Sequence, residues 1–300
     1  MIGLSSFCSY SQPEEKKLIV FLVDKVTLED LDNMDFTKAI SQEGAIGLMN
    51  TRSHGSSNEY SSALTIGSGT RAEASYFSAR SQNLDDESVH IYERRNGYMT
   101  AQGKIANLDI AKLKEINKKN NFNPIIGALG SSLKMNNKKI SVIGNSDIDS
   151  REARLGVLVG MDENGLVDYG AVGEDMNINA SDYPYGVKTN YDMMLTKYEY
   201  LSTKSDLLIL ELGDLHRLEK YKANLSPEIY IGLREKVLSD MDLFINNVYN
   251  LVDKNNTRIM VVSPTYSSVA AKSAKKLTPI IISGSGVQDG ILSSDTTRRE

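Results

Sequence analysis

Short apolar runs that end abruptly in polar residues constrain this chain more than any other feature. Leu18–Asp24 is such a run, apolar up to Val23 and then acidic. Runs this short and this rich in Val and Ile are typical of strands buried on both faces. Further runs of this kind lie at 45–50, 139–147, 206–214, 258–264 and 277–286.

Segments with helical periodicity separate most of these strands. They cover 27–44, 57–74, 107–120, 123–137 and 226–255. Gly44 is a plausible helix stop, and Pro227 suits the first turn of the last and longest helix. Buried strands that alternate with amphipathic helices predict an α/β fold, with a mostly parallel central sheet and helices on both faces.

The composition excludes several classes of protein and site. Charged residues make up 24% of the 300 residues and the net charge is −5, with no basic stripe interleaved with aromatics, so we expect no nucleic-acid partner. The single cysteine, Cys8, excludes an intramolecular disulfide and a cysteine-based zinc cluster. With three histidines, a histidine-rich metal site is not expected. No stretch is long enough to span a bilayer.

The two ends of the chain differ from the rest. Residues 1–17 are small, apolar and hydroxylic before they turn polar, which is typical of either a disordered tail or the remnant of a secretion signal. Residues 18–300 then form one α/β domain, with an inserted subregion within about 80–200. The last residues, 293–300, complete no visible element, so we expect truncation at the C-terminus.

Chemistry in an open parallel sheet lies beyond the carboxyl ends of its strands. Asp24 and Asp214 both follow predicted strands, where paired carboxylates can hold a divalent cation. They can also act as N-caps of the helices that follow, and spacing alone favours this role over metal binding. The serine-rich turn at 53–62 precedes a predicted helix, where a hydroxyl is well placed as a nucleophile or as an ordinary cap.

The order of these segments resembles the alkaline phosphatase superfamily, which includes phosphoglycerate mutases, nucleotide pyrophosphatases and sulfatases. The phrases that carry the resemblance include "VFLVDKVTLEDL", "ALTIGSGTRAEA", "LLILELGDLHRLEKY" and "LTPIIISGSGVQDG", and they extend from about 18 to 300. The chain is most similar to an extracytoplasmic domain of bacterial membrane-associated proteins, usually followed by more chain, often with membrane spans. The resemblance therefore implies an extracytoplasmic location, and attachment to the membrane through segments missing here.

The resemblance also implies a two-metal site with zinc or manganese and a Ser or Thr nucleophile at a helix start. Asp24 matches the first metal-binding Asp, and Asp214 matches the Asp of a D-x-x-x-H motif. The nucleophile region matches 56–59, which makes Ser57 the first candidate and Ser56 the second; Asn58, which cannot attack, is the third.

Departures from this plan are as informative as the matches. Leu218 stands where the motif has its His, and His216 is offset by two positions, so on a helix we expect it to point elsewhere. Ser263, Pro264 and Thr265 replace an Asp-His pair, and no His occurs around Ser273. Asp24 and Asp214 remain, with His216 as a third metal candidate, so Asp24 is expected instead to cap a helix or to pair with Lys25 or Arg71.

Three hypotheses follow. The first is a degenerate domain, non-catalytic or weakly active, in the extracytoplasmic part of a larger membrane protein. The second is a metal-dependent phosphoester or sulfoester hydrolase with a reduced metal site. The third is a module that binds a small phosphorylated or sulfated ligand without chemistry, through the turn at 56–58 and Arg71.

Overall fold

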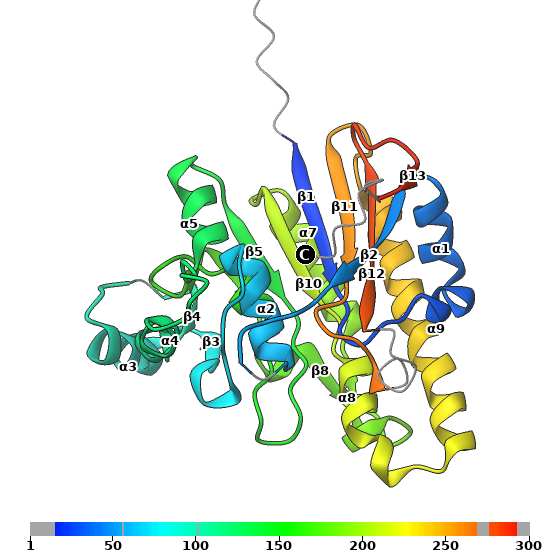
Figure 1. Ribbon diagram of the computed structural model, residues 1–300, viewed down its shortest axis with the longest axis horizontal. Helices are drawn as coiled ribbons and strands as arrows, with labels where there is room; N and C mark the ends of the chain where they lie inside the picture. The colour runs from blue at the N-terminus through cyan, green and yellow to red at the C-terminus, as the bar shows by residue number, and fades with distance from the viewer. Residues whose placement is uncertain (1–15, 56, 101, 269–275, 293–300) are drawn as a thin grey trace, which may run out of the picture.

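A single large sheet organises the computed structural model, which describes residues 16–55, 57–100, 102–268 and 276–292. Its eight strands follow the order β13-β2-β12-β11-β1-β10-β5-β7 (Figure 1). In chain order these strands are β1 (Lys17–Leu22), β2 (Ala45–Asn50), β5 (Ile140–Ile143), β7 (Tyr169–Ala171), β10 (Leu207–Glu211), β11 (Thr257–Val262), β12 (Leu277–Gly284) and β13 (Gly290–Ile291).

Strand direction confirms the prediction of a mostly parallel sheet. β1 pairs in parallel with β10 and β11, β10 with β5, β5 with β7, and β2 with β13. Only β12 runs the other way among the described strands of this sheet, antiparallel to both β11 and β2. The carboxyl ends of β1, β10, β11 and β2 therefore meet at one edge.

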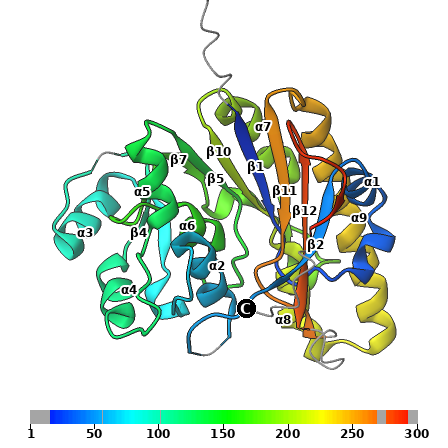
Figure 2. The same ribbon diagram turned by 45° about the horizontal axis from the view of Figure 1, so that its top comes forward.

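Helices cover both faces of the sheet, as predicted (Figures 1 and 2). The described α-helices are α1 (Asp35–Gln42), α2 (Glu59–Ser68), α3 (Asp86–Asn96), α4 (Ile110–Asn117), α5 (Ala128–Met135), α6 (Leu155–Gly160), α7 (Tyr191–Ser202), α8 (Asp214–Tyr221) and α9 (Pro227–Leu251). The expected helix at 27–44 divides into a short 3-10 turn, η1 (Glu29–Asn33), and α1. Pro227 does occupy the first turn of α9.

The alternation of side chains along β1 separates two hydrophobic cores. Ile19 and Phe21 pack with α1, α7, α8 and α9 on one face. Val20 and Leu22 pack with α2 and α6 on the other. Because successive side chains of a strand point to opposite faces, the apolar run that follows Lys17 in β1 is the expected result of covering both faces.

Close contact between α2 and α6 depends on a glycine. A Cβ added at Gly67 of α2 would lie 2.4 Å from the carbonyl oxygen of Leu158 in α6. Since real Cβ atoms do not approach that closely, only glycine allows this packing. The C-terminal end of α2 is thereby held against α6.

The region from about 80 to 200 contributes both to the large sheet and to smaller ones. β5 and β7 join the large sheet, whereas β3 (Ser81–Asn83), β4 (Ile105–Asn107) and β6 (Leu166–Val167) form a three-stranded antiparallel sheet. β8 (Asn177–Asn179) and β9 (Val187–Thr189) form a hairpin. Figure 2 shows α3 and α4 at the opposite side of the molecule from α1 and α9. Among the described helices, none combines the length and apolarity needed to cross a bilayer.

Candidate functional site

The carboxyl ends of β1, β10 and β11 bring together residues that are far apart in the sequence. β1 lies between the other two strands, so the residues that follow all three meet at one place. Asp24 follows β1, α8 with Asp214 and His216 follows β10, and Thr265 follows β11. This edge is where the sequence predicts the site, and where ligands bind in open α/β sheets generally.

Asp24 is buried and is paired on several sides. Thr265 donates its hydroxyl to Oδ1, and Nδ1 of His216 lies 2.8 Å from Oδ2. Nζ of Lys25 is 4.0 Å from Oδ2. Burial alone would raise the pKa of Asp24, but Lys25, His216 and Thr265 outweigh it and lower the pKa to about 2. The side chain is therefore a carboxylate at neutral pH.

Two expectations for Asp24 can now be decided. It caps no helix, because η1 begins at Glu29 and its preceding residue, Leu28, makes no side-chain cap. Of the two cations considered as partners, Lys25 lies beside it and Arg71 does not contact it: the Arg71 guanidinium stacks on the ring of Phe122 instead, 4.9 Å from its centre.

His216 contradicts the expectation that it would point away. It lies in the first turn of α8, is buried, and faces Asp24. The physical reason is the helix itself: positions two apart differ by about 200° around the axis. Asp214 and His216 must therefore diverge, and the residue that turns toward β1 is His216.

Asp214 belongs to a separate buried network. Its Oδ1 accepts hydrogen bonds from the Thr189 amide (2.8 Å) and from Nη2 of Arg217 (2.8 Å), and Oδ2 accepts one from the Tyr191 hydroxyl (2.7 Å). Gly213 is the cap residue of α8, so the expected capping role for Asp214 is wrong. Arg217 is fully buried and also donates to Thr189 Oγ1 at 2.6 Å.

Sequence reasoning missed Arg217. Arg217 stands three residues after Asp214, the spacing at which side chains on a helix meet, and this is the signal that could have found it.

Sequence reasoning missed Glu59 as well, the first residue of α2, which is buried and pairs with Lys220 of α8 at 2.6 Å. Burial would raise the pKa of Glu59, but the nearby His216 and Lys220 lower it. Glu59 thus links the start of α2 to α8.

The three nucleophile candidates have different surroundings. Ser56 lies outside the described residues. Ser57 is exposed and directly precedes Asn58. Asn58 is the N-cap of α2: its Oδ1 accepts from the Ser61 amide at 2.9 Å, and its Nδ2 donates to the Ala74 carbonyl. The assignment of Ser57, Ser56 and Asn58 to catalysis stays a prediction.

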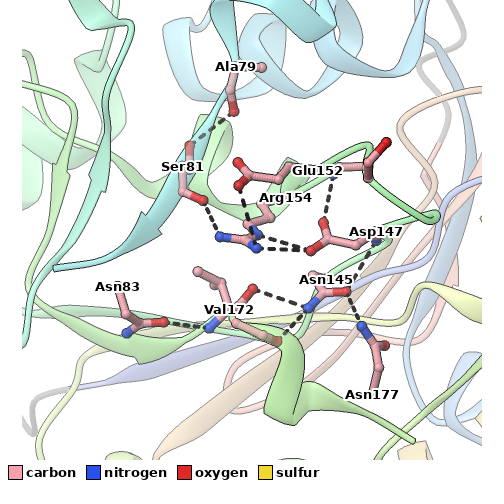
Figure 3. Close-up of polar contacts among 12 residues, drawn as sticks. Ala79, Ser81, Asn83, Asn145, Asp147, Glu152, Arg154, Val172 and Asn177 are labelled. Carbon is pink, nitrogen blue, oxygen red and sulfur yellow. Dashed lines mark hydrogen bonds and ion pairs between the residues drawn. The ribbon is translucent and has the colours of Figure 1, made fainter. Parts of the chain in front are cut away.

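The end of β5 holds a network of another kind (Figure 3). Nη2 of Arg154 lies 3.0 Å from Oδ2 of Asp147, and Arg154 also donates to the carbonyl of Ser81 in β3. Asn145 donates to the carbonyls of Val172 and Gly173. These contacts join the large sheet to the small one, so we assign them to the architecture.

The end of β10 carries a buried acid, Glu211. Its carboxyl accepts from the Ser146 hydroxyl (2.6 Å) and from the Gly156 amide (2.8 Å). Burial raises the pKa of Glu211 to about 8 despite these two hydrogen bonds, which lower it. Both carboxyl oxygens of Glu211 are thus engaged, one by the loop after β5 and the other by the first turn of α6.

The residues present do not fit a two-metal site. Across the described ranges, no three or more His, Cys, Asp and Glu side chains gather as a metal site requires. Asp24 and His216 form a pair, while Asp214 faces Arg217. Such a site needs several anionic or imidazole ligands around each ion. The assignment of Asp24, Asp214 and His216 as ligands of zinc or manganese stays a prediction.

Comparison with known proteins identifies the architecture. A Vibrio parahaemolyticus structure described as a protein in the alkaline phosphatase superfamily matches with a TM-score of 0.53 and 11% identity, over 93% of this chain and 62% of that one. The chain has the alkaline phosphatase fold. This confirms the fold predicted from the sequence resemblance.

Two further solved structures match this chain to a similar degree. The PH0037 protein from Pyrococcus horikoshii matches with a TM-score of 0.53 and 12% identity, over 93% of this chain and 88% of that one. The lipoteichoic acid synthase LtaP from Listeria monocytogenes matches with a TM-score of 0.51 and 11% identity, over 93% and 68%. No family model and no curated protein sequence matches the chain. At these identities the likeness establishes the fold alone.

Proposed function

We propose that this chain is a non-catalytic domain with the alkaline phosphatase fold, which serves as an extracytoplasmic module of a larger membrane protein. One observation carries the non-catalytic part of the proposal: the protein itself neutralises both carboxylates that match metal-ligand positions. Asp24 is held by His216, Thr265 and Lys25. Asp214 is held by Arg217, Thr189 and Tyr191.

Electrostatics makes Arg217 the decisive neighbour of Asp214. At an effective dielectric constant of about 20, two unit charges 4 Å apart interact with about 4 kcal/mol. A divalent cation beside Asp214 would meet roughly twice that as repulsion from the guanidinium. Because Arg217 is fully buried in α8, solvent cannot screen it, and the side chain has no room to swing out. The position that matches a metal-binding Asp thus already holds a cation.

The location outside the cytoplasm rests on the sequence resemblance to extracytoplasmic domains. A fusion of the native gene to alkaline phosphatase or to green fluorescent protein tests it, since the first is active only after export and the second fluoresces only when it stays inside. Export of the domain is the expected result. Fluorescence of the second fusion with no activity of the first contradicts this part of the proposal.

The test of the non-catalytic state combines metal binding with turnover. The purified chain is titrated with Zn²⁺ and Mn²⁺ by calorimetry, and hydrolysis of an aryl phosphate and an aryl sulfate is followed in parallel. We expect neither saturable binding at the strand ends nor turnover. Asp24→Asn is the matched variant: activity that the native chain shows and Asp24→Asn lacks would overturn the proposal.

The same experiment decides the second candidate, a metal-dependent phosphoester or sulfoester hydrolase with a reduced site. The observation that favours it is the Asp24–His216 contact, with Glu59 close enough for His216 to lower the pKa of its carboxyl. A single ion bound there would be lost in both Asp24→Asn and His216→Gln. It would be retained in Asp214→Asn, since Asp214 lies in the other network.

A further inference from the structure

A groove beside the strand ends has the features of a site for an organic anion. Its volume is about 760 Å³, and residues at the end of β2 and in α2 line it. Pocket volumes of about 300–1,000 Å³ suit small-molecule ligands. Pro264 lines the groove and is the chain neighbour of Thr265, which contacts Asp24.

Two arginines line this groove without acidic partners. Arg52 and Arg71 contribute to the wall, and no Asp or Glu is among its described lining residues. Within the described part of the chain, neither guanidinium has a carboxylate oxygen within 4.0 Å, whereas Arg80, Arg154, Arg217 and Arg234 all do. In a chain of net charge −5, two uncompensated guanidiniums in one groove form a local positive site.

The position of Arg71 is fixed before any ligand arrives. Its guanidinium lies over the ring of Phe122 at 4.9 Å, and both residues are tied to one buried side chain, Asn120. Asn120 donates from Nδ2 to the Arg71 carbonyl (2.9 Å), and its Oδ1 accepts from the Phe122 amide (2.9 Å). A guanidinium held against an aromatic face keeps its N–H fork free for a carboxylate or phosphate.

Helix polarity acts against an anion here, but it is the weaker effect. Arg71 follows the C-terminal end of α2, about 15 Å from the turn at 56–58 by helix length. The anion hypothesis that joined Arg71 to that turn therefore spans the two ends of one helix. A helix C-terminus carries roughly half a negative charge, and two guanidiniums exceed it about fourfold.

We propose that this groove binds a small organic anion, a phosphate ester or carboxylate with an apolar body, through Arg52 and Arg71. Met49, Ile66, Phe122 and Pro264 provide the apolar wall, and bidentate guanidinium contacts hold the anionic end. The inference goes beyond the proposed function, because it needs neither a metal nor a reaction. It assigns a ligand class to a groove that lies beside the Asp24 pair.

The test uses phenylphosphonate, which no phosphatase can hydrolyse, in buffer with EDTA. Binding is followed by calorimetry and by ligand-observed NMR, with benzoate as the carboxylate and benzyl alcohol as the uncharged analogue. We expect saturable binding of at least one of the two anions and none of benzyl alcohol. Because neither metal nor turnover is involved, the result is independent of the metal and activity assays.

Variants assign any binding to the groove. Arg71→Gln and Arg52→Gln are each expected to weaken binding at least about tenfold, the effect of losing one charge-assisted hydrogen bond. Arg94→Gln, an exposed arginine of α3 away from the groove, is the matched control and leaves the affinity unchanged. Circular dichroism and thermal midpoints verify folding, and Arg52, which is exposed, gives a variant that folds in any case.

Three results overturn the inference: no saturable binding of either anion, equal affinity in Arg52→Gln, Arg71→Gln and Arg94→Gln, or benzyl alcohol that binds as tightly as the anions. A comparison of phenylphosphonate with benzoate then selects the ligand within the class. Tighter binding of the phosphonate indicates a phosphate ester, and tighter binding of benzoate indicates a carboxylate.

Discussion

Three neighbours determine the charge of Asp24. Burial opposes ionisation, and Lys25, His216 and Thr265 together overcome it. The pKa of about 2 in the folded state lies below the ordinary value of 3.8 for an aspartate side chain. The ionised side chain therefore stabilises the folded state at pH values above about 4, and this contribution is lost as the pH falls toward 2.

The first prediction follows from this shift in pKa. The difference in unfolding free energy between the native chain and Asp24→Asn should shrink by about 2 kcal/mol from pH 5 to pH 2. Urea unfolding at several pH values measures it. Asp32→Asn, at an exposed acid, is the control and should show no comparable trend. A difference between native and Asp24→Asn chains that stays constant with pH would contradict the assigned pKa.

Arg217 and Asp214 form the second testable pair. Removal of the guanidinium in Arg217→Met leaves Asp214 buried beside the Thr189 amide and the Tyr191 hydroxyl but without its cation. We expect a loss of about 3–5 kcal/mol of unfolding free energy. Urea denaturation measures it, and Arg94→Met at an exposed site should change stability by less than about 0.5 kcal/mol.

A double-mutant cycle distinguishes this ion pair from simple loss of packing. Asp214→Asn combined with Arg217→Met removes both charges, so its cost should fall well below the sum of the two single costs. Additive costs would show that the two charges do not interact. The metal site would then regain Asp214 as a candidate ligand.

Sequence reasoning located Asp24 and Asp214 at this edge and named Lys25 as a partner of Asp24, but it did not find His216 or Thr265 beside Asp24, or Arg217 beside Asp214. Asp24 and Asp214 follow apolar runs that become β1 and β10, so their placement follows from local pattern. The Asp214–Arg217 contact follows from their spacing on α8, whereas the contact of His216 with Asp24 depends on the angle at which α8 leaves β10, which no local pattern encodes. His216 faces Asp24, and Arg217 faces Asp214, because α8 starts at Asp214.

At the scale of elements, the start of α2 depends on Asn58. Its side-chain oxygen accepts a hydrogen bond from the Ser61 amide, and its side-chain nitrogen donates one to the Ala74 carbonyl. Asn58 thus caps the N-terminus of α2 and fixes the segment around Ala74 against it. Asn58→Ala should lower the unfolding free energy by about 1–2 kcal/mol. Asn58→Ser should cost less, because a hydroxyl can still accept from Ser61. Equal stability of Asn58→Ala and the native chain in urea unfolding would contradict the capping role.

The elements that the sequence predicted share a strong local signal. β2 at 45–50 matches its apolar run, and α9 begins at the predicted proline. α6 was missed because six buried apolar residues carry no polar face to mark a helix. The antiparallel direction of β12 was missed for another reason: strand direction depends on the path of the connection and not on the strand's own residues.

At the scale of the whole molecule, stability is expected to be uneven. The two cores on β1 and β10 lie beneath helices on both faces of the large sheet, whereas α3 packs through Tyr92 into a small separate cluster with Leu84 and Leu108. Amide hydrogen exchange should therefore show β1 and β10 exchanging only by global unfolding, and α3 by local opening at lower free energy. Equal protection in α3 and β10 would contradict this division.

The buried Arg217 has a consequence for the evolution of this chain. To bind a metal at Asp214, a descendant would first have to lose the guanidinium, which leaves a carboxylate stranded in the interior. Alternatively, it would first gain new metal ligands while the Arg217 guanidinium still occupies the site beside Asp214. Each order passes through an intermediate several kcal/mol less stable, and proteins have little stability to spare. The Asp214–Arg217 ion pair therefore opposes the appearance of a metal centre at this position by any single substitution that keeps the fold stable.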